Sequence, residues 1–131
     1  MNIDIHIYGV HARDDMIADT ASKLGLSSDY IHYDDRPNGG LMMYTAKKAW
    51  LSPVSKRITH RICLSDDTEV CDDFLSIATK IAEAHPKSII SFFPYEFMKK
   101  TPEVEGLDTP YLKCHILSGC GIMMPIEYIE P

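Results

Sequence analysis

The stretch THRICLSDD, which occupies positions 59–67, decides the fold. Its middle, Ile62 to Leu64, is a short apolar run of the kind that forms a strand buried inside a sheet. Two consecutive carboxylates, Asp66 and Asp67, follow it after Ser65. The sequence therefore predicts a buried strand whose carboxyl end carries acidic side chains.

Strands and helices alternate on both sides of this stretch. Ile3, Ile5 and Ile7 alternate with polar residues, which predicts a strand over 2–10 with one well-buried face. Helical spacing of apolar residues predicts helices over 14–24, 41–51 and 74–85. Short β-prone runs predict strands over 30–33, 88–93 and 111–117, and 122–129 fits a strand or the start of a helix. This order predicts a single α/β domain over 1–131, a three-layer sandwich with a mostly parallel central sheet.

Local signals mark the ends of two of these helices. Gly25 is a typical residue for ending the first helix. Asp72 and Asp73 precede the helix that starts at Phe74, and we expect them to cap it. Its buried face is predicted to carry four residues: Phe74, Ile77, Ala78 and Ile81.

Polar residues follow three of the predicted strands. His11 and Arg13 come after the first strand, Asp35 after the second, and the pair Asp66 and Asp67 after the third. Ligands of open α/β sheets bind at the carboxyl ends of the strands, and parallel strands place those ends at one edge. We therefore expect these side chains to lie close together.

Asp66 and Asp67 are the sharpest of these candidates. Paired carboxylates at the end of a buried strand are costly unless something neutralises them. Hard cations such as Mg²⁺ and Mn²⁺ prefer carboxylate oxygen, and such a metal would in turn bind a diphosphate. The alternative is that the two acids cap the following helix, although that helix begins several residues later. We therefore predict a metal site at this pair.

Other candidate residues carry weaker signals. Gly39 and Gly40 would let the backbone approach a phosphate, but the loop lacks the dinucleotide and P-loop patterns and equally fits an ordinary helix entry. Lys47, on the helix that follows, would pair with phosphate or lie in solvent. Among the histidines, we place only His11 and His115 near a site.

Composition and charge exclude several classes of protein. The chain has 13 Lys and Arg against 19 Asp and Glu, a net charge of −6, without the basic patch that nucleic-acid binding requires. No run approaches the roughly 18 apolar residues of a membrane span, and the N-terminus lacks signal-peptide features. The four cysteines have no CxxC spacing, so we expect small buried side chains in a cytoplasmic protein.

The order of these segments resembles a known family. The segment from Asp35 to Gly40, a helix, the strand from His60 into Asp66 and Asp67, and then Phe74 resemble the glycosyltransferases of the GT-A fold, in particular their family 2 and family 25 branches. In that fold a strand ends in an acidic DxD-type motif before a helix that begins near a Phe. The stretch GCGIMMP, at 119–125, is similar to the glycine-plus-strand segment after the motif. The resemblance implies a Rossmann-like, nucleotide-sugar-binding fold.

The resemblance also implies roles for individual residues. Asp67 would take the metal-binding final position of the motif, and Asp66 the central position, with Mn²⁺ or Mg²⁺ as the metal. His11 and Arg13 would meet the nucleotide base, Asp35 the base or ribose, and Lys47 the diphosphate. The residues that would bind the donor are these six: His11, Arg13, Asp35, Gly40, Lys47 and Asp66.

The implied activity is transfer of a sugar from a UDP- or GDP-linked donor to an unknown acceptor, with the metal stabilising the departing diphosphate. Ser65 stands where the family has its first acid, and a hydroxyl is a poorer ligand. Enzymes of this fold also usually continue further, with acceptor-binding elements, and the sequence offers no clear catalytic base. Both departures favour the alternative of a non-catalytic nucleotide- or nucleotide-sugar-binding module. A small interaction protein is a second alternative, and the Met pairs at 42–43 and 123–124 would allow a homo-oligomer.

Overall fold

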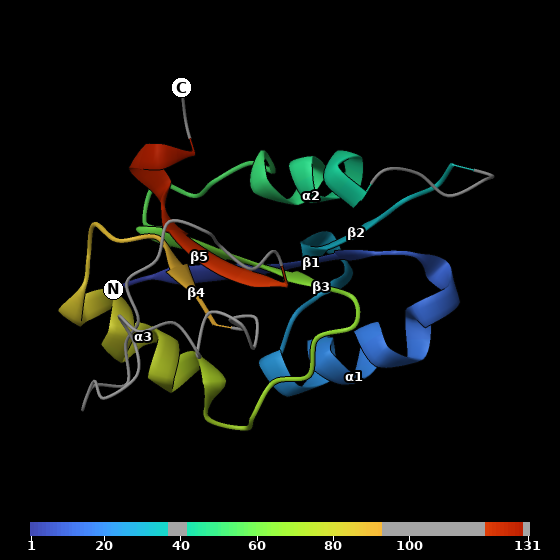
Figure 1. Ribbon diagram of the computed structural model, residues 1–131, viewed down its shortest axis with the longest axis horizontal. Helices are drawn as coiled ribbons and strands as arrows, with labels where there is room; N and C mark the ends of the chain where they lie inside the picture. Colours follow the sequence, from blue (N-terminus) through green and yellow to red (C-terminus); the bar gives the residue numbers. More distant parts are fainter. Residues whose placement is uncertain (37–41, 93–119, 130–131) are drawn as a thin grey trace, which may run out of the picture.

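The computed structural model describes residues 1–36, 42–92 and 120–129, which form a five-stranded sheet with helices on both faces (Figure 1). The strands are β1 (Ile3–Gly9), β2 (Ile31–Tyr33), β3 (His60–Ser65), β4 (Ile90–Ser91) and β5 (Gly121–Pro125). The helices are α1 (Asp14–Leu24), α2 (Met42–Trp50) and α3 (Phe74–Ala84). Three 3-10 turns cover His11–Arg13, Ser28–Tyr30 and Ile126–Tyr128. The predicted α/β alternation is confirmed for these residues.

The strands lie in the order β2-β1-β3-β5-β4. β1 runs parallel to β2 and β3, whereas β5 runs antiparallel to both β3 and β4. The sheet is therefore mixed, and the predicted parallel arrangement is confirmed only for β2, β1 and β3. The ambiguous segment over 122–129 is a strand as far as Pro125 and then forms a 3-10 turn. The predicted strand over 111–117 lies outside the described residues, as do Gly39, Gly40, Cys114 and His115.

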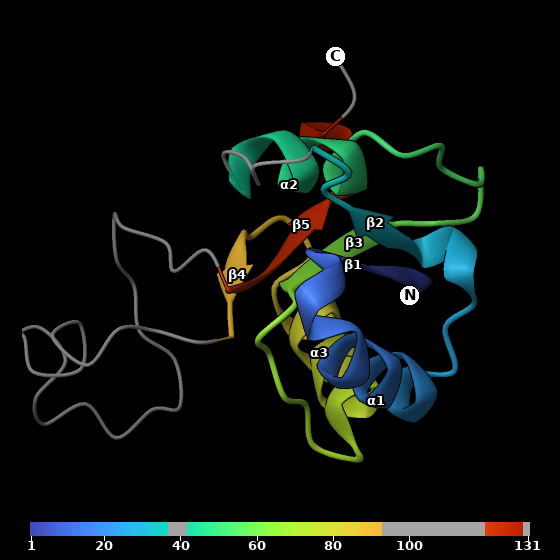
Figure 2. The same cartoon turned by 90° about the vertical axis from the view of Figure 1, so that its right-hand side faces the viewer.

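Three layers make up the molecule. α1 and α3 cover one face of the sheet, and α2 covers the other (Figure 1 and Figure 2). The apolar face of β1 and β3 meets α1 and α3 in the main core, where Ile7, Ile62 and Leu64 are almost completely buried. Met123 of β5 lies in the same core, so it is not available for contact between copies of the chain, whereas Met43 is exposed.

The face of the sheet beneath α2 is polar and is nevertheless buried. Asp4, His6 and Tyr8 of β1 point towards α2, and the structure corrects the prediction that only one face of this strand is well buried. Arg61 of β3 is fully buried there and forms a two-point ion pair with Asp4, with Nε–Oδ1 at 3.0 Å and Nη2–Oδ2 at 2.7 Å. A buried charge is tolerable only when it is paired and fully hydrogen-bonded, and this pair meets that requirement.

Arg61 also donates hydrogen bonds to the carbonyl oxygens at the end of α2. Its Nη1 donates to the carbonyl oxygens of Ala49, Trp50 and Ser52 at 3.3, 2.9 and 2.6 Å. The last carbonyls of a helix have no partner within the helix, and they carry the negative end of its dipole. The guanidinium therefore holds α2 on the sheet through hydrogen bonds and through its attraction to the negative end of the helix dipole.

Two histidines extend this polar cluster to the edge of the sheet. His6 lies 3.3 Å from Asp4 (Nε2–Oδ2) and 2.9 Å from His32 (Nδ1–Nε2). Burial, assisted by the positive charges of neighbouring side chains, lowers the pKa of His32 from 6.5 to about 4. For Asp4, burial favours a higher pKa, but hydrogen bonds from His6 and Arg61 outweigh it and lower the pKa.

The low pKa of His32 predicts a loss of stability on acidification. Between pH 6.5 and about 4 the unfolded chain binds a proton at this position that the folded protein does not, so the free energy of unfolding falls as the pH decreases. We expect urea denaturation of the His32→Gln variant to show a flatter pH dependence in this window, with His85→Gln as the control. An unchanged slope in His32→Gln would contradict the assignment.

Three local predictions are corrected. Asp73 occupies the N-cap of α3 but makes no side-chain capping hydrogen bond. In α3, Phe74 and Ala78 are buried as predicted and Ile81 packs partly buried against the core, but Ile77 is 40% exposed and Ala82 is buried instead. Among the cysteines, Cys63 is buried as expected, but Cys71 is exposed.

Candidate functional site

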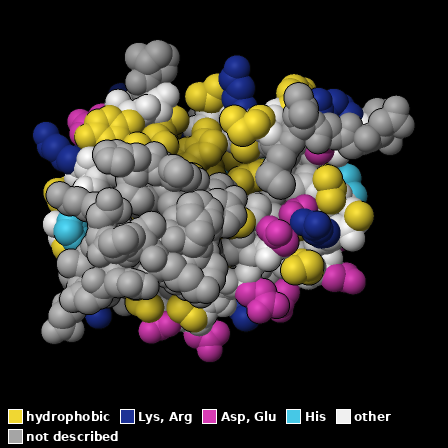
Figure 3. Space-filling view, in the orientation of Figure 1, with side chains coloured by type: hydrophobic (Ala, Val, Ile, Leu, Met, Phe, Trp, Pro, Cys, Tyr) yellow, Lys and Arg dark blue, Asp and Glu magenta, His cyan; other side chains and the backbone are white. Residues whose placement is uncertain are grey.

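The carboxyl ends of β1, β2 and β3 meet at one edge of the molecule, on the right in Figure 1. Acidic and basic side chains gather on this side in the space-filling view of Figure 3. The structure brings five of the predicted residues to this edge: His11, Arg13, Asp35, Asp66 and Asp67. The prediction that the strand ends gather these side chains is confirmed for this set.

Asp66 is buried and both of its carboxylate oxygens have donors from the chain. Oδ1 accepts from Nη1 of Arg13 at 2.7 Å, and Oδ2 accepts from the backbone N–H of Val10 at 3.0 Å. Charge-assisted hydrogen bonds of this kind are the stronger ones in proteins. Asp66 therefore fastens the loop after β1 to the loop after β3, and the buried carboxylate is neutralised by Arg13.

Gly9, the last residue of β1, allows this arrangement. A Cβ atom at Gly9 would overlap the Cβ and Oδ2 atoms of Asp66. Only a residue without a side chain lets the two loops approach this closely. Gly9 was not among the predicted site residues, because a single glycine at a strand end is a common feature.

Asp67 faces solvent beside this buried pair. Its side chain is 53% exposed, its Oδ1 accepts from the hydroxyl of Ser65 at 2.6 Å, and its Oδ2 lies 3.9 Å from Nη1 of Arg13. The guanidinium of Arg13 therefore lies between two carboxylates. Ser65 holds Asp67 in position through this hydrogen bond.

An aromatic stack lies on the β1 and β2 side of the same edge. The rings of His11 and Tyr33 are parallel within 9°, with their centroids 3.9 Å apart. His11 also lies 3.3 Å from Asp35 (Nε2–Oδ1) and 3.6 Å from Asp14 (Nδ1–Oδ1). Tyr33 was not among the predicted site residues either, because it is the last residue of a three-residue strand and its side-chain direction cannot be read from so short a pattern.

The other acid after β2 belongs to a separate ion pair. Asp34 is buried and accepts from both Nε and Nη2 of Arg36 at 3.0 Å, which lowers the pKa of its carboxyl. The Arg36 guanidinium also lies 4.3 Å from the centre of the Tyr44 ring. Arg36 is thus held by its ion pair with Asp34 and by a cation–π contact with Tyr44.

Two predicted site residues do not lie in the group of side chains at the carboxyl ends of β1, β2 and β3. Lys47 is exposed on α2, in a pocket beside β2, and no contact joins it to Asp66 or Asp67 among the described residues. Gly40 lies outside the described residues. Its expected role near a phosphate stays a prediction.

The carboxylate pair, as arranged, does not fit a resident divalent cation. Asp66 has no oxygen free of a hydrogen-bond donor, and Arg13 holds the position between the two carboxylates. Across residues 1–36, 42–92 and 120–129, no group of three or more metal-ligating side chains is placed to hold a metal. The metal site at Asp66 and Asp67 therefore stays a prediction.

Removal of Arg13 is expected to create the cation site that its guanidinium fills. In Arg13→Ala the carboxylates of Asp66 and Asp67 lose their cation, so Mn²⁺ alone should stabilise this variant by about 1 kcal/mol, or roughly 4 °C in Tm. The wild-type protein and Arg13→Lys, which keep a positive charge, should show no such shift with Mn²⁺. Equal Mn²⁺ stabilisation of wild type and Arg13→Ala in thermal unfolding would show that Arg13 does not exclude the metal.

No family model, curated protein or solved structure matches the chain. The geometry of this edge is therefore the basis for assigning a function. Among the described residues, none of the helices is long and apolar enough to cross a membrane.

Proposed function

We propose that the edge formed by the carboxyl ends of β1, β2 and β3 binds a nucleotide or a nucleotide sugar. The observation that carries this proposal is the stack of the exposed His11 ring on Tyr33, with Arg13 two positions further along the same 3-10 turn. It offers a flat surface for a base and a cation within one loop. This is the role that the resemblance to GT-A glycosyltransferases assigned to His11 and Arg13.

Stacking supplies the affinity and polar groups supply the orientation. The His11 side chain is 58% exposed, so a base can lie against its free face, and base–aromatic stacking is worth about 1–3 kcal/mol. Asp35, whose side chain is 74% exposed, can accept hydrogen bonds from ribose hydroxyls or from a base amino group. These contacts recognise the nucleoside portion of the ligand.

The phosphates meet a mixed electrostatic surface. Arg13 is half exposed, but it already neutralises Asp66, and Asp67 adds a negative charge beside it. Mg²⁺ usually binds through one or two carboxylates together with substrate phosphates. A Mn²⁺ or Mg²⁺ ion that arrives with the nucleotide would therefore use Asp67, whereas Asp66 stays committed to Arg13 and Val10.

The edge supports binding more directly than it supports catalysis. Asp66 is paired with Arg13, His11 lies between Asp35 and Asp14, and the acids between positions 96 and 108 lie outside the described residues. We therefore favour a nucleotide-binding module over an active glycosyltransferase. Sugar transfer remains the second candidate, on the strength of the acids that follow β3.

Thermal unfolding with UDP and GDP, each with and without Mn²⁺, tests the proposal. We expect one nucleotide to raise the Tm of wild type, His11→Ala to reduce that shift, and His11→Phe to keep most of it, because a phenyl ring preserves the stack. His85→Ala, at the end of α3, serves as the control. Unchanged Tm values with every nucleotide and metal combination would refute the proposal. Release of free nucleoside diphosphate from a sugar nucleotide would then distinguish an enzyme from a binding module.

A further inference from the structure

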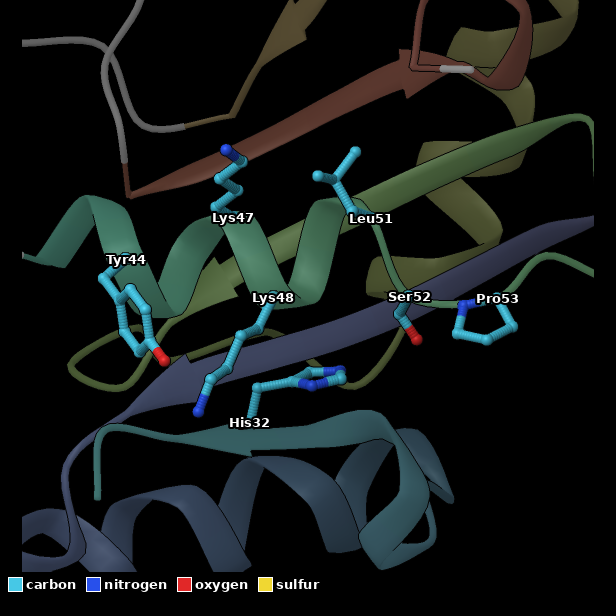
Figure 4. Close-up of a pocket in the computed structure, with 7 residues that line it drawn as sticks. All are labelled: His32, Tyr44, Lys47, Lys48, Leu51, Ser52 and Pro53. Carbon is cyan, nitrogen blue, oxygen red and sulfur yellow. The ribbon is translucent and has the colours of Figure 1, made fainter. Parts of the chain in front are cut away.

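We propose that the pocket between α2 and β2 is a second binding site, for an organic oxyanion on an apolar body. The pocket has a volume of about 610 Å³ and is lined by residues of both elements and of the segment after α2: His32, Tyr44, Lys47, Lys48, Leu51, Ser52 and Pro53 (Figure 4). This volume falls within the range of small-molecule sites, about 300–1,000 Å³. The pocket shares no lining residue with the proposed nucleotide edge.

The polar lining forms a row along one side of α2. Tyr44 and Lys48 lie four residues apart on one face of α2, Ser52 follows in the segment after the helix, and Figure 4 shows all three facing β2. Lys47 points to the other side of α2. The row therefore presents an ammonium group between two hydroxyl groups, and it suits an elongated ligand that lies in the groove.

The charge of the pocket is positive in a protein that is acidic as a whole. Its lining contains two lysines and no acid, and neither lysine forms an ion pair among the described residues. Lys48 is held at the wall by the carbonyl oxygen of Tyr33 at 3.5 Å and lies 5.0 Å from the centre of the Tyr44 ring. The Lys48 ammonium can therefore pair with an oxyanion without breaking an existing ion pair.

His32 adds a ring nitrogen to the lining, and the buried cluster holds its ring in place. Nε2 of His32 lies 2.9 Å from Nδ1 of His6, whose Nε2 lies 3.3 Å from Oδ2 of Asp4. Nε2 of His32 is therefore engaged in the cluster. Its Nδ1 can form a hydrogen bond with a polar group of the ligand.

The remaining lining is apolar and selects the body of the ligand. Pro53 and the Tyr44 ring lie at the two ends of this row, whereas Leu51, which is 56% exposed, points with Lys47 to the other side of α2 (Figure 4). An apolar or aromatic group would cover this surface, while its charged group lies at Lys48. Phosphate monoesters and carboxylates share this chemistry.

Titration with phenyl phosphate and with benzoate, followed by amide NMR, tests the inference. We expect at least one of them to shift amides of α2 and β2 and to bind more tightly than phenol or inorganic phosphate, which carry only the ring or only the charge. Lys48→Gln should weaken this binding about tenfold, the effect of losing one charge-assisted hydrogen bond. Lys47→Gln should weaken it less, and Lys80→Gln, on α3, serves as the control.

Two outcomes would overturn the inference. The first is that neither phenyl phosphate nor benzoate shifts the amides of α2 and β2. The second is binding that survives Lys48→Gln but is lost in His11→Ala, which would place the anion at the nucleotide edge. Because the two sites use different residues, failure here leaves the nucleotide proposal standing, and the reverse also holds.

Discussion

Replacement of Arg61 with alanine is expected to lower the free energy of unfolding by about 3–5 kcal/mol, which is a large part of the stability of a domain of this size. The variant would leave the buried carboxylate of Asp4 without its cation. It would also leave the carbonyl oxygens at the end of α2 without the donors that Arg61 supplies. Each loss is costly because the cluster is shielded from water.

Urea denaturation of Arg61→Ala beside Arg57→Ala measures this effect. Arg57 is an exposed arginine of the preceding loop, so its removal should change stability by no more than about 0.5 kcal/mol. Asp4→Asn, alone and combined with Arg61→Ala, completes a double-mutant cycle. We expect the double variant to lose less than the sum of the single losses, because the two side chains depend on each other. Additive losses would show that Arg61 acts only through α2.

Replacement of Gly9 with alanine is the second large effect that we expect. The new methyl group would overlap Asp66, and the overlap involves the Cβ atom of Asp66, which cannot move without displacing the loop after β3. Overpacking of this kind costs about 1–3 kcal/mol. Displacement of Asp66 would also break its bonds to Val10 and Arg13, so we expect the loss to reach the top of that range or exceed it.

The matched control for this variant is Gly25→Ala. Gly25 has φ of 66°, but a Cβ atom there would meet no other atom within 4 Å, so its cost is only that of the left-handed backbone, about 1–2 kcal/mol. Chemical denaturation of both variants separates overlap from backbone strain. Combining Gly9→Ala with Asp66→Gly removes the overlapping atom and should recover part of the loss. A Gly9→Ala variant no less stable than Gly25→Ala would contradict the close approach of the two loops.

Sequence pattern predicted the order of the elements because each pattern is local. The alternation around Ile5, the helical spacing from Ile17 and the glycine at position 25 each act within a few residues, and the structure agrees with them. Because the carboxyl ends of parallel strands meet at one edge of a sheet, the sequence also predicted that His11, Arg13 and the acids after β3 lie together. These predictions needed only the direction of the strands.

The remaining features depend on contacts between residues far apart in the chain. The burial of His6 and Asp4 results from α2 crossing that face of the sheet, which alternation in β1 does not reveal. Arg13 was predicted to meet a nucleotide base, and its ion pair with Asp66 spans 53 positions. Ile77 was predicted to be buried from helical spacing alone, but the exact rotation of a helix is set by the surface on which it packs.

The position of β5 has a consequence for the order in which the chain folds. β4 has β5 as its only neighbour in the described sheet, and β5 begins at Gly121, thirty positions after β4 ends at Ser91. During synthesis, β1, β2 and β3 can pair as soon as Ser65 has left the ribosome, but β4 must wait until β5, which ends at Pro125, has emerged. Non-local pairing of this kind is slow because two segments far apart in the chain must first come together. The edge that carries the proposed nucleotide site can therefore assemble early, while the opposite edge of the sheet is completed last.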